Sequence, residues 1–272
     1  MHSLAQRVLR TEQLPFTFCP GCGDGIVVQM TARAIDELGI LDRVCTLGGV
    51  GCSSWIATYF NVDFMKVPHG RALPAAMGLK LTNPERKVLV FTGDGDCVAI
   101  GGNHFIHAAH RNIDLAVIML NNQIYGMTGG QVAPTTPAGA ITVTSPYGKI
   151  EPPFDACELA RAAGATFISR WTTAHPWQLL NAIKKAIQHP GFAFVEVVSP
   201  CPAQSGLYIQ GSSDPVQLVE WMQQNYITQE EMDLLSPAER EGRTLVGDFL
   251  AAIRPEFAAR THELIDRLKE EK

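Results

Sequence analysis

The sequence predicts an α/β protein whose mostly parallel sheet is covered by helices on both faces. Short apolar runs rich in β-branched residues alternate along the chain with longer segments of helical periodicity. The strand candidates are apolar on both faces, which is typical of parallel strands buried between two layers of helices. The chain has 272 residues, 46% hydrophobic and 18% charged, so it can bury a large core without disulfides.

Strands and helices are predicted in alternation. The strands cover residues 43–47, 87–92, 115–120, 165–169 and 193–198. The helices cover residues 26–38, 73–81, 98–110, 154–163 and 176–188. No internal repeat interrupts this alternation, so one sheet is expected to organise the chain.

Two regions depart from the alternation. Residues 127–153 are rich in Gly, Thr and Pro and have no periodicity, and loops of this length inside a domain are usually functional or mobile. From residue 210 the chain becomes more charged and helical, with an amphipathic segment at 216–222 and a charged end at 261–272. We therefore divide the chain into a cofactor-binding domain, 1–209, and a helical C-terminal extension, 210–272.

Composition and charge exclude several classes of protein. The net charge of −5 offers no basic surface for nucleic acid. The apolar runs, such as 115–120, are far shorter than the ~20 residues needed to span a membrane, and the N-terminus lacks the apolar stretch of a secretory signal. The odd number of cysteines, 7, argues against a full set of disulfides. We expect a soluble cytoplasmic protein that binds neither nucleic acid nor membrane.

Small, polar or thiol-bearing residues follow four of the predicted strands. Gly-Gly-Val-Gly-Cys-Ser follows the first strand and Gly-Asp-Gly-Asp the second; an Asn-Asn pair follows the third and Ser-Pro-Cys-Pro the last. Ligands of parallel α/β sheets bind beyond the carboxyl ends of the strands. These residues therefore predict a cofactor site at one edge of the sheet.

The strongest signal is a Gly-Asp-Gly motif at Asp94 combined with an Asn-Asn pair that ends in Asn122. The two residues are 28 positions apart, which suits neighbouring strand ends joined by one crossover helix. A carboxylate, an amide oxygen and the backbone carbonyl of Ile124 are ligands that Mg²⁺ accepts together with phosphate oxygens. The flanking glycines allow the backbone to approach a diphosphate. A second Gly-Asp-Gly, at 23–25, lacks both the preceding strand and the matching asparagine.

These motifs resemble the thiamine diphosphate motif. Three further stretches, at 19–23 (Cys-Pro-Gly-Cys-Gly), 69–72 (His-Gly-Arg-Ala) and 124–131 (Ile-Tyr-Gly-Met-Thr-Gly-Gly-Gln), resemble the β subunit of 2-oxoacid:ferredoxin oxidoreductases. The resemblance covers about residues 15–210 and is greatest to the 2-oxoglutarate type, 2-oxoglutarate synthase. It implies a thiamine diphosphate-binding fold and the reversible, coenzyme A-dependent oxidative decarboxylation of 2-oxoglutarate to succinyl-CoA and CO₂, with ferredoxin as the electron acceptor.

The resemblance also implies roles for individual residues. Asp94, Asn122 and the carbonyl of Ile124 would hold Mg²⁺, and His69 would be catalytic. The residues implied to contact thiamine diphosphate are Val50, Gly51, Cys52, Ser53, His69, Gly95, Asp96, Gly126 and Met127.

Four cysteines are candidate ligands of one [4Fe–4S] cluster. Cys19 and Cys22 form a Cys-x-x-Cys motif, and Cys52 and Cys201 each follow a strand at the predicted edge. Four thiolates suit either such a cluster or zinc. The family places its cluster at matching positions, and electrons that leave the thiamine adduct need an acceptor. No role is assigned to the three other cysteines, which are Cys45, Cys97 and Cys157.

The glutamate that would activate the thiamine ring is not identified in this chain. Glu151, Glu158 and Glu196 are nearest to the predicted edge, but their places in a loop, a helix and a strand fit the task poorly. A second α/β domain does not fit in the remaining length. We therefore expect an α subunit that carries the pyrimidine-binding domain, in an α2β2 heterotetramer.

Other functions stay open from the sequence alone. Pyruvate or another 2-oxo acid is an alternative substrate, because no group that would bind the distal carboxylate of 2-oxoglutarate is visible. A non-redox thiamine lyase or ligase domain with structural zinc is a second alternative. A scaffold subunit that retains the cofactor fold without catalysis is a third.

Overall fold

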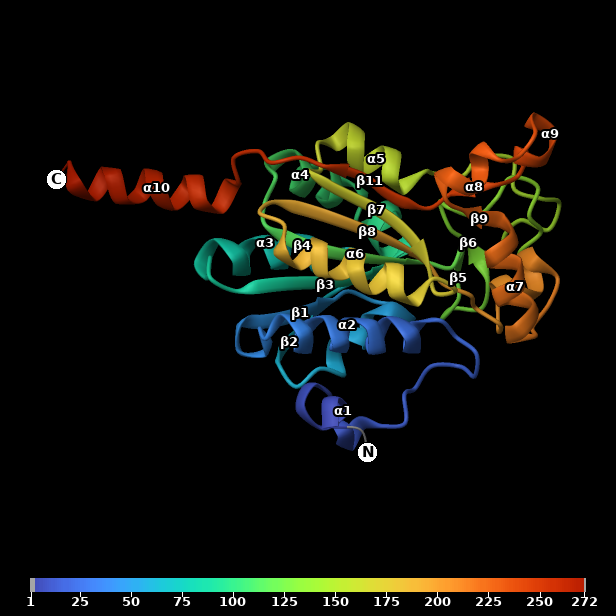
Figure 1. Cartoon of the computed structure of the whole chain (residues 1–272), viewed down its shortest axis with the longest axis horizontal. Coiled ribbons are helices and arrows are strands. Elements are labelled where there is room, and N and C mark those ends of the chain that lie inside the picture. Colours follow the sequence, from blue (N-terminus) through green and yellow to red (C-terminus); the bar gives the residue numbers. More distant parts are fainter. Residues whose placement is uncertain (1–2, 272) are drawn as a thin grey trace.

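One seven-stranded sheet organises the chain, which the computed structural model describes over residues 3–271 (Figure 1). The strands lie in the order β11-β7-β8-β4-β3-β1-β2. All neighbouring pairs are parallel except β11 and β7, which are antiparallel. The strands are β1 (Val44–Gly48), β2 (Asp63–Lys66), β3 (Lys87–Gly93), β4 (Leu115–Asn121), β7 (Phe167–Thr172), β8 (Phe192–Val198) and β11 (Gly247–Ala251).

Helices cover both faces of the sheet and enclose two cores. Strand β3 shows the principle, because Leu89 and Phe91 point into one core while Val88 and Val90 point into the other. The predicted fold class is therefore confirmed. The first core is closed by α2 (Asp24–Leu38) and α6 (Pro176–Gln188), and the second by α3 (Ala72–Thr82), α4 (Gly102–Arg111) and α5 (Ala156–Ala163).

Shorter elements lie outside these layers. They include π-helical segments at Gly95–Ile100 and Gly206–Gln210 and 3₁₀ segments at Thr11–Gln13, Leu41–Arg43 and Cys52–Thr58. Two small sheets pair β5 with β6 and β9 with β10. The remaining elements are α1 (Ser3–Val8), β5 (Ile124–Tyr125), β6 (Gln131–Val132), α7 (Pro215–Asn225), β9 (Tyr226–Ile227), α8 (Gln229–Asp233), α9 (Pro237–Arg240), β10 (Thr244–Leu245) and α10 (Phe257–Glu270).

All five predicted strands exist, but one predicted helix is interrupted. Residues 98–110 were expected to form a continuous helix, whereas the chain is π-helical up to Ile100 and α4 begins only at Gly102. A Cβ atom on Gly101 would lie 2.4 Å from the carbonyl oxygen of Asp96. The helix is therefore interrupted at Gly101, where the backbone passes close to the carbonyl of Asp96. This interruption separates the π-helical residues that face the site from α4, which packs against the sheet.

The C-terminal part is less purely helical than predicted. Residues 210–271 contain α7, α8, α9 and α10, but also three strands that the sequence analysis missed. Of these, β11 joins the main sheet, so this part of the chain completes the fold instead of only flanking it. The strand is only partly buried and therefore lacks a clear apolar pattern. The expected terminal helix, 261–272, corresponds to α10, and Lys272 lies outside the described residues.

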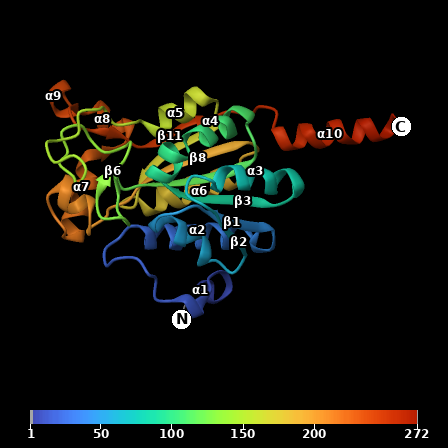
Figure 2. The ribbon, with the colours of Figure 1, turned by 180° about the vertical axis from the view of Figure 1, so that it is seen from behind.

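Helix α10 projects from the end of the molecule opposite α7 and β5 (Figures 1 and 2). The segment that leads into α10 is held in place by Asn112, the residue that ends α4 with a left-handed φ of 50°. The Asn112 Nδ2 donates to the carbonyls of Arg254 and Pro255, each at 3.2 Å. Its Oδ1 accepts from Thr166 Oγ1 at 2.6 Å and from the backbone N–H of Phe192 at 2.9 Å. One buried amide thus joins the start of β8 and the residue before β7 to the C-terminal segment.

No helix within residues 3–271 is both long enough and apolar enough to cross a lipid bilayer.

Replacing Asn112 tests this junction. Asn112→Ala removes all four hydrogen bonds and should lower the free energy of unfolding by about 2–4 kcal/mol, because buried partners lose their bonds. Asn112→Gly tolerates the left-handed backbone and should recover only about 1 kcal/mol of that loss. Urea denaturation measures both. A glycine variant as stable as the original protein would show that the side chain contributes nothing.

Candidate functional site

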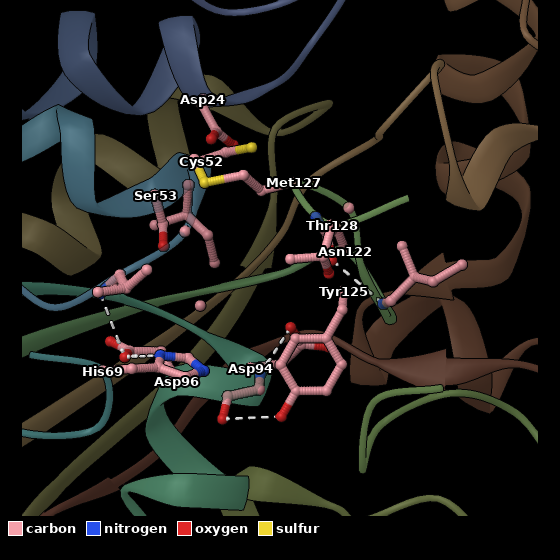
Figure 3. Close-up of a pocket in the computed structure, with 17 residues that line it drawn as sticks. Asp24, Cys52, Ser53, His69, Asp94, Asp96, Asn122, Tyr125, Met127 and Thr128 are labelled. Atoms are coloured by element: carbon pink, nitrogen blue, oxygen red, sulfur yellow. Dashed lines mark hydrogen bonds and ion pairs between the residues drawn. The ribbon is translucent and has the colours of Figure 1, made fainter. Parts of the chain in front are cut away.

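A pocket opens beyond the carboxyl ends of β1, β3 and β4 (Figure 3). Its walls contain every residue predicted to bind thiamine diphosphate or Mg²⁺, so the structure brings together segments that are far apart in the sequence. Five further residues complete its walls: Asp24, Gly93, Leu120, Tyr125 and Thr128. Of these, only Gly93 was predicted to belong to the site, as one of the glycines that flank Asp94.

The carboxylate of Asp96 holds three walls of this pocket in place. Its Oδ1 accepts from His69 Nδ1 at 2.5 Å, from the N–H of Gly70 at 2.7 Å and from the N–H of Val50 at 3.3 Å. Its Oδ2 accepts from Thr92 Oγ1 at 2.7 Å. The side chain of Asp96, predicted to contact the cofactor, therefore accepts four hydrogen bonds from protein donors. It fixes the loops after β1 and before α3 relative to the end of β3.

Glycine at position 49 is required for this arrangement. A Cβ atom there would lie 2.3 Å from Asp96 Oδ2, closer than any side chain can approach. The absence of a side chain lets the loop after β1 pass directly over the buried carboxylate.

His69 is oriented by its bond to Asp96. An ionised carboxylate only accepts hydrogen bonds, so the proton on the His69 ring belongs on Nδ1. The other ring nitrogen, Nε2, is then left for a ligand in the pocket. The ring of Tyr125 lies edge-on at 6.2 Å between centroids and limits the space available to the imidazole.

Asp94 is buried at the end of β3, with 4% of its surface exposed. Its Oδ1 accepts from the N–H of Gly95 at 2.9 Å, and its Oδ2 accepts a short hydrogen bond from Thr135 Oγ1. Burial raises the pKa of Asp94 to about 6, although both hydrogen bonds lower it. The ionised form is thus poorly compensated by this chain alone, and a cation would stabilise it.

Thr135 belongs to the long segment 127–153, which was predicted to have no regular structure and to be functional or mobile. That segment contains β6 and folds back onto the site. Lys149 Nζ donates to the carbonyls of Pro134 at 3.1 Å and Thr136 at 2.7 Å, on either side of Thr135. The threonine that contacts Asp94 is therefore held from both sides. No motif in the sequence identified it.

The turn after β4 carries the other predicted Mg²⁺ ligands. Asn122 Oδ1 accepts from the N–H of Ile124 at 3.1 Å and retains a second lone pair for a metal. Between them, Gln123 adopts a left-handed φ of 63°, and its carbonyl accepts from Thr136 Oγ1 at 2.5 Å. The turn is therefore fixed by the same segment that contacts Asp94.

Tyr125 closes the pocket over Gly95. Its hydroxyl donates to the Gly95 carbonyl at 3.3 Å. A Cβ atom on Gly95 would lie 2.2 Å from the tyrosine ring, so only glycine permits this contact. Tyr125 lies within the 124–131 motif, but no role was predicted for it.

The four predicted cluster cysteines lie near one another beside the pocket. The N–H of Gly23 donates to the Pro200 carbonyl at 3.3 Å, which joins the Cys-x-x-Cys loop to the segment that carries Cys201. Burial raises the pKa of the Cys52 thiol to about 11, and the charges of Asp24, Cys201 and Cys19 add to the effect. Burial also raises the pKa of Cys22, where Cys201 and Cys52 again contribute.

Asp24 lies between the cysteines and the pocket and was not predicted as a site residue. It is 5% exposed, lines the pocket, and accepts from Ser199 Oγ at 3.1 Å. Figure 3 places its carboxylate beside Cys52. Burial raises the pKa of Asp24 to about 6. The second Gly-Asp-Gly motif, set aside as a diphosphate site, thus supplies a buried carboxylate at the cysteine group.

Gly126 lies where the two parts of the site meet. A Cβ atom there would be 3.4 Å from Asn122 Nδ2 and 3.4 Å from Cys201 Sγ. The predicted metal-binding turn and the cysteine group are therefore direct neighbours. The remaining cysteines, Cys45, Cys97 and Cys157, are packed in the second core.

Comparisons with known proteins agree with this geometry. Residues 49–197 match the family described as "Thiamine pyrophosphate enzyme, C-terminal TPP binding domain". The chain is 48% identical to 2-oxoglutarate synthase subunit KorB of Methanocaldococcus jannaschii, over 98% of this chain and 99% of the relative. It is 47% identical to the subunit of the same name from Methanothermobacter marburgensis, over 96% of this chain and 91% of the relative.

A solved structure is similar over nearly the whole chain. It is 2-oxoglutarate:ferredoxin oxidoreductase from Magnetococcus marinus with 2-oxoglutarate, coenzyme A and succinyl-CoA bound. The TM-score is 0.85 and the sequence identity 28%, and the match covers 97% of this chain and 90% of the other.

These relatives are subunits of oxidoreductases, which favours the predicted oxidoreductase over the lyase and scaffold alternatives. The family model confirms a domain that binds thiamine diphosphate. The chain belongs to the KorB family, the β subunits of thiamine diphosphate-dependent 2-oxoglutarate oxidoreductases.

Proposed function

We propose that this chain, with an α subunit, converts 2-oxoglutarate and coenzyme A to succinyl-CoA and CO₂, and that the electrons pass through a [4Fe–4S] cluster to ferredoxin. The observation that carries the proposal is the junction at Gly126, where oxygen ligands suited to Mg²⁺ adjoin a group of cysteines. A cofactor in the pocket and a cluster beside it would be close enough to exchange electrons. The reverse reaction, driven by reduced ferredoxin, uses the same groups.

The donor set at the pocket floor fits Mg²⁺. We assign Asp94, the amide oxygen of Asn122 and the carbonyl of Ile124 as its ligands, because Mg²⁺ prefers oxygen and shares its coordination with phosphates. The poorly compensated charge of Asp94 supports this assignment, since a divalent cation would offset the cost of burial.

Thiamine diphosphate, when bound, acts as the electron sink that makes decarboxylation of a 2-oxo acid feasible. The chain's own residues bind and orient it: segments 50–53, 95–96 and 126–127 line the pocket. We assign His69 as a catalytic residue because Asp96 fixes the proton on Nδ1 and leaves Nε2 for the ligand. This nitrogen can accept a proton, or a hydrogen bond from a donor group of the cofactor or substrate.

The donor set of Cys19, Cys22, Cys52 and Cys201 fits a [4Fe–4S] cluster. Burial raises the pKa values of Cys22 and Cys52, and the charges of the neighbouring thiolates raise them further. Binding to iron as thiolates would offset both effects. Zinc would do so equally, and the redox character of the relatives supports iron. All seven cysteines are free, which is typical of reducing compartments, and we propose a cytoplasmic location.

The surface around the pocket supports assembly with an α subunit. Val50, Ile100 and Met127 are 44%, 50% and 50% exposed although they are apolar. None of Glu151, Glu158 and Glu196 lines the pocket in the described chain, so the activating glutamate is assigned to the partner. The α subunit would also supply the contacts to coenzyme A and to the distal carboxylate, and two such pairs would form an α2β2 heterotetramer.

The first test compares the isolated chain with the co-expressed pair. With 2-oxoglutarate, coenzyme A and a viologen dye, the pair should reduce the dye and the isolated chain should not. Pyruvate serves as the competing substrate and should react more slowly. Equal turnover by the single chain would contradict the need for a partner, and a preference for pyruvate would overturn the substrate assignment.

Asp94→Ala tests the Mg²⁺ assignment. The variant should lose thiamine diphosphate on desalting, because the diphosphate would then face the pocket without its cation. Iron content and circular dichroism should stay unchanged, which distinguishes this loss from unfolding. Stoichiometric cofactor in the desalted variant would exclude Asp94 as a ligand.

Single serine substitutions test the cluster ligands. Cys52→Ser and Cys201→Ser should each lose the broad visible absorbance and most of the iron, whereas Cys157→Ser, buried in the second core, should keep both. The measurements are iron and sulfide content after anaerobic purification. A full complement of iron in the Cys52 and Cys201 variants would disprove this ligand set.

A further inference from the structure

Glu196 is a buried carboxylate that none of the roles above uses. It lies in β8, with 2% of its surface exposed. Its Oε1 accepts from Asn121 Nδ2 at 2.6 Å. Its Oε2 accepts from Arg170 Nε at 2.7 Å and from the Cys157 thiol at 3.3 Å. A buried carboxylate that accepts three hydrogen bonds, yet does not line the pocket, needs a structural or functional explanation.

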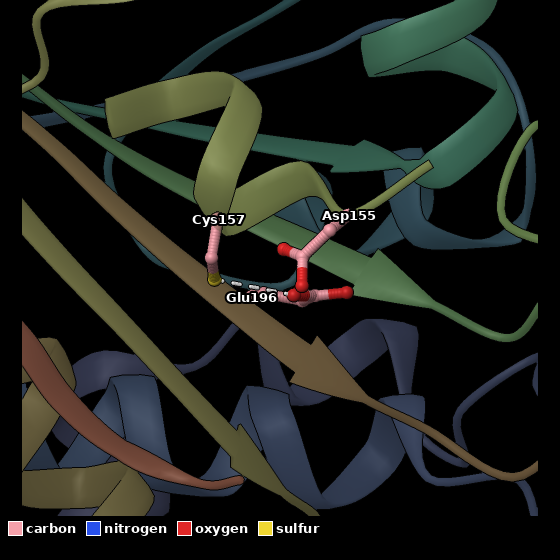
Figure 4. Close-up of side chains that lie close together, drawn as sticks. All are labelled: Asp155, Cys157 and Glu196. Atoms are coloured by element: carbon pink, nitrogen blue, oxygen red, sulfur yellow. Dashed lines mark hydrogen bonds between the residues drawn. The ribbon is translucent and has the colours of Figure 1, made fainter. Parts of the chain in front are cut away.

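The surroundings of Glu196 look at first like a metal site. The ligand atoms of Asp155, Cys157 and Glu196 all lie within 4.8 Å of one another (Figure 4). However, the guanidinium of Arg170 already provides the positive charge. It donates from Nη2 to Asp155 Oδ1 at 2.7 Å as well as from Nε to Glu196. The group is therefore an ion-pair network and not a cation site.

Stability alone does not account for this network. Burying an ion pair costs desolvation energy, and apolar replacements of similar volume are often as stable or more so. A buried pair can instead fix one geometry among several. On the side that faces the pocket, Glu196 contacts Asn121 and fixes the orientation of its side chain.

The contact between Glu196 and Asn121 sets the orientation of the asparagine amide. An ionised carboxylate only accepts hydrogen bonds, so the NH₂ end of Asn121 must face Glu196. The oxygen end then faces the N–H of Gln123 and accepts from it at 3.0 Å. With the amide reversed, two NH groups would oppose each other and the turn would lose this bond. Glu196 thereby stabilises the left-handed conformation of Gln123.

That turn carries the assigned metal ligands Asn122 and Ile124, one residue to either side of Gln123. Glu196 therefore acts on the metal site through its hydrogen bond to Asn121.

We propose that Glu196 is a positioning residue that holds the turn after β4 in the conformation that binds Mg²⁺. The proposal rests on the proposed function, because it presupposes Mg²⁺ and thiamine diphosphate in the pocket. Partners of this kind behind metal ligands typically change metal affinity by about 10–100-fold when they are replaced.

The test uses the co-expressed pair with Glu196→Gln, after removal of Mg²⁺ and thiamine diphosphate with a chelator. Cofactor binding is titrated with Mg²⁺ at fixed thiamine diphosphate. We expect the Mg²⁺ concentration for half-saturation to rise about tenfold or more. At saturating Mg²⁺ the variant should bind the cofactor fully, with an unchanged KM for 2-oxoglutarate.

Asp155→Asn is the matched control. It removes the other carboxylate from Arg170 but leaves the Glu196–Asn121 bond intact, so its Mg²⁺ half-saturation should stay within about twofold of the original protein. A shift as large as that of Glu196→Gln would show that the whole ion-pair network matters and not Glu196 in particular.

Asn121→Ala tests the same link if Glu196→Gln does not fold. Asn121→Ala should weaken Mg²⁺ binding about as much as Glu196→Gln does. In the double variant, Glu196→Gln should cause little further loss of Mg²⁺ affinity. Unchanged half-saturation in Glu196→Gln, or a loss of cofactor that no Mg²⁺ concentration restores, would overturn the proposal. If the original pair bound thiamine diphosphate without Mg²⁺, the proposed function itself would fail instead.

Discussion

The hydrogen bonds to the Asp96 carboxylate hold the architecture of the pocket together. One buried side chain accepts from the loop after β1, from His69 and Gly70 before α3, and from Thr92 at the end of β3. Each of these segments reaches the same edge because the strands run parallel. The sheet brings the segments to one place, and Asp96 sets their spacing and the orientation of the imidazole.

Beside the hydrogen bonds to Asp96, the site has two halves with different chemistry. Hard oxygen donors at Asp94 and the turn after β4 suit a divalent cation, and the soft sulfur donors on the other side of Gly126 suit a redox centre. Gly126 lies between the two halves, and because it has no side chain, no group is inserted between the oxygen donors and the cysteines. Asp24 adds a buried carboxylate between the cysteines and the pocket. The arrangement is what a reaction needs when electrons leave a bound organic cofactor.

The sheet and most of the pocket could be predicted because their signals are local. Strands β3 and β4 are uninterrupted apolar runs, and the residues directly after them follow the rule for ligand sites in parallel sheets. Asp94 and Asn122 were found by spacing, whereas His69 and Met127 were found only by resemblance to a family. The structure places all four on one pocket.

What could not be predicted depends on contacts between distant segments. Strand β2 is exposed along its length and β11 is half-exposed, so neither has an apolar alternation to detect. Thr135 reaches Asp94 from 41 residues away, through a loop without periodicity. Glu196 contacts Asn121 across 75 residues, and its position within an apolar strand gave no indication of this. Such partners become visible only when the chain is folded.

The most direct test of the account is whether electrons from the substrate reach the cysteine-bound centre. The measurement is the visible absorbance of the anaerobically purified pair, recorded as 2-oxoglutarate and coenzyme A are added without any external acceptor. We expect the iron–sulfur absorbance to bleach, and to return when oxidised ferredoxin is added. A colourless protein that contains zinc, or an iron–sulfur absorbance that stays constant while 2-oxoglutarate is consumed, would contradict it.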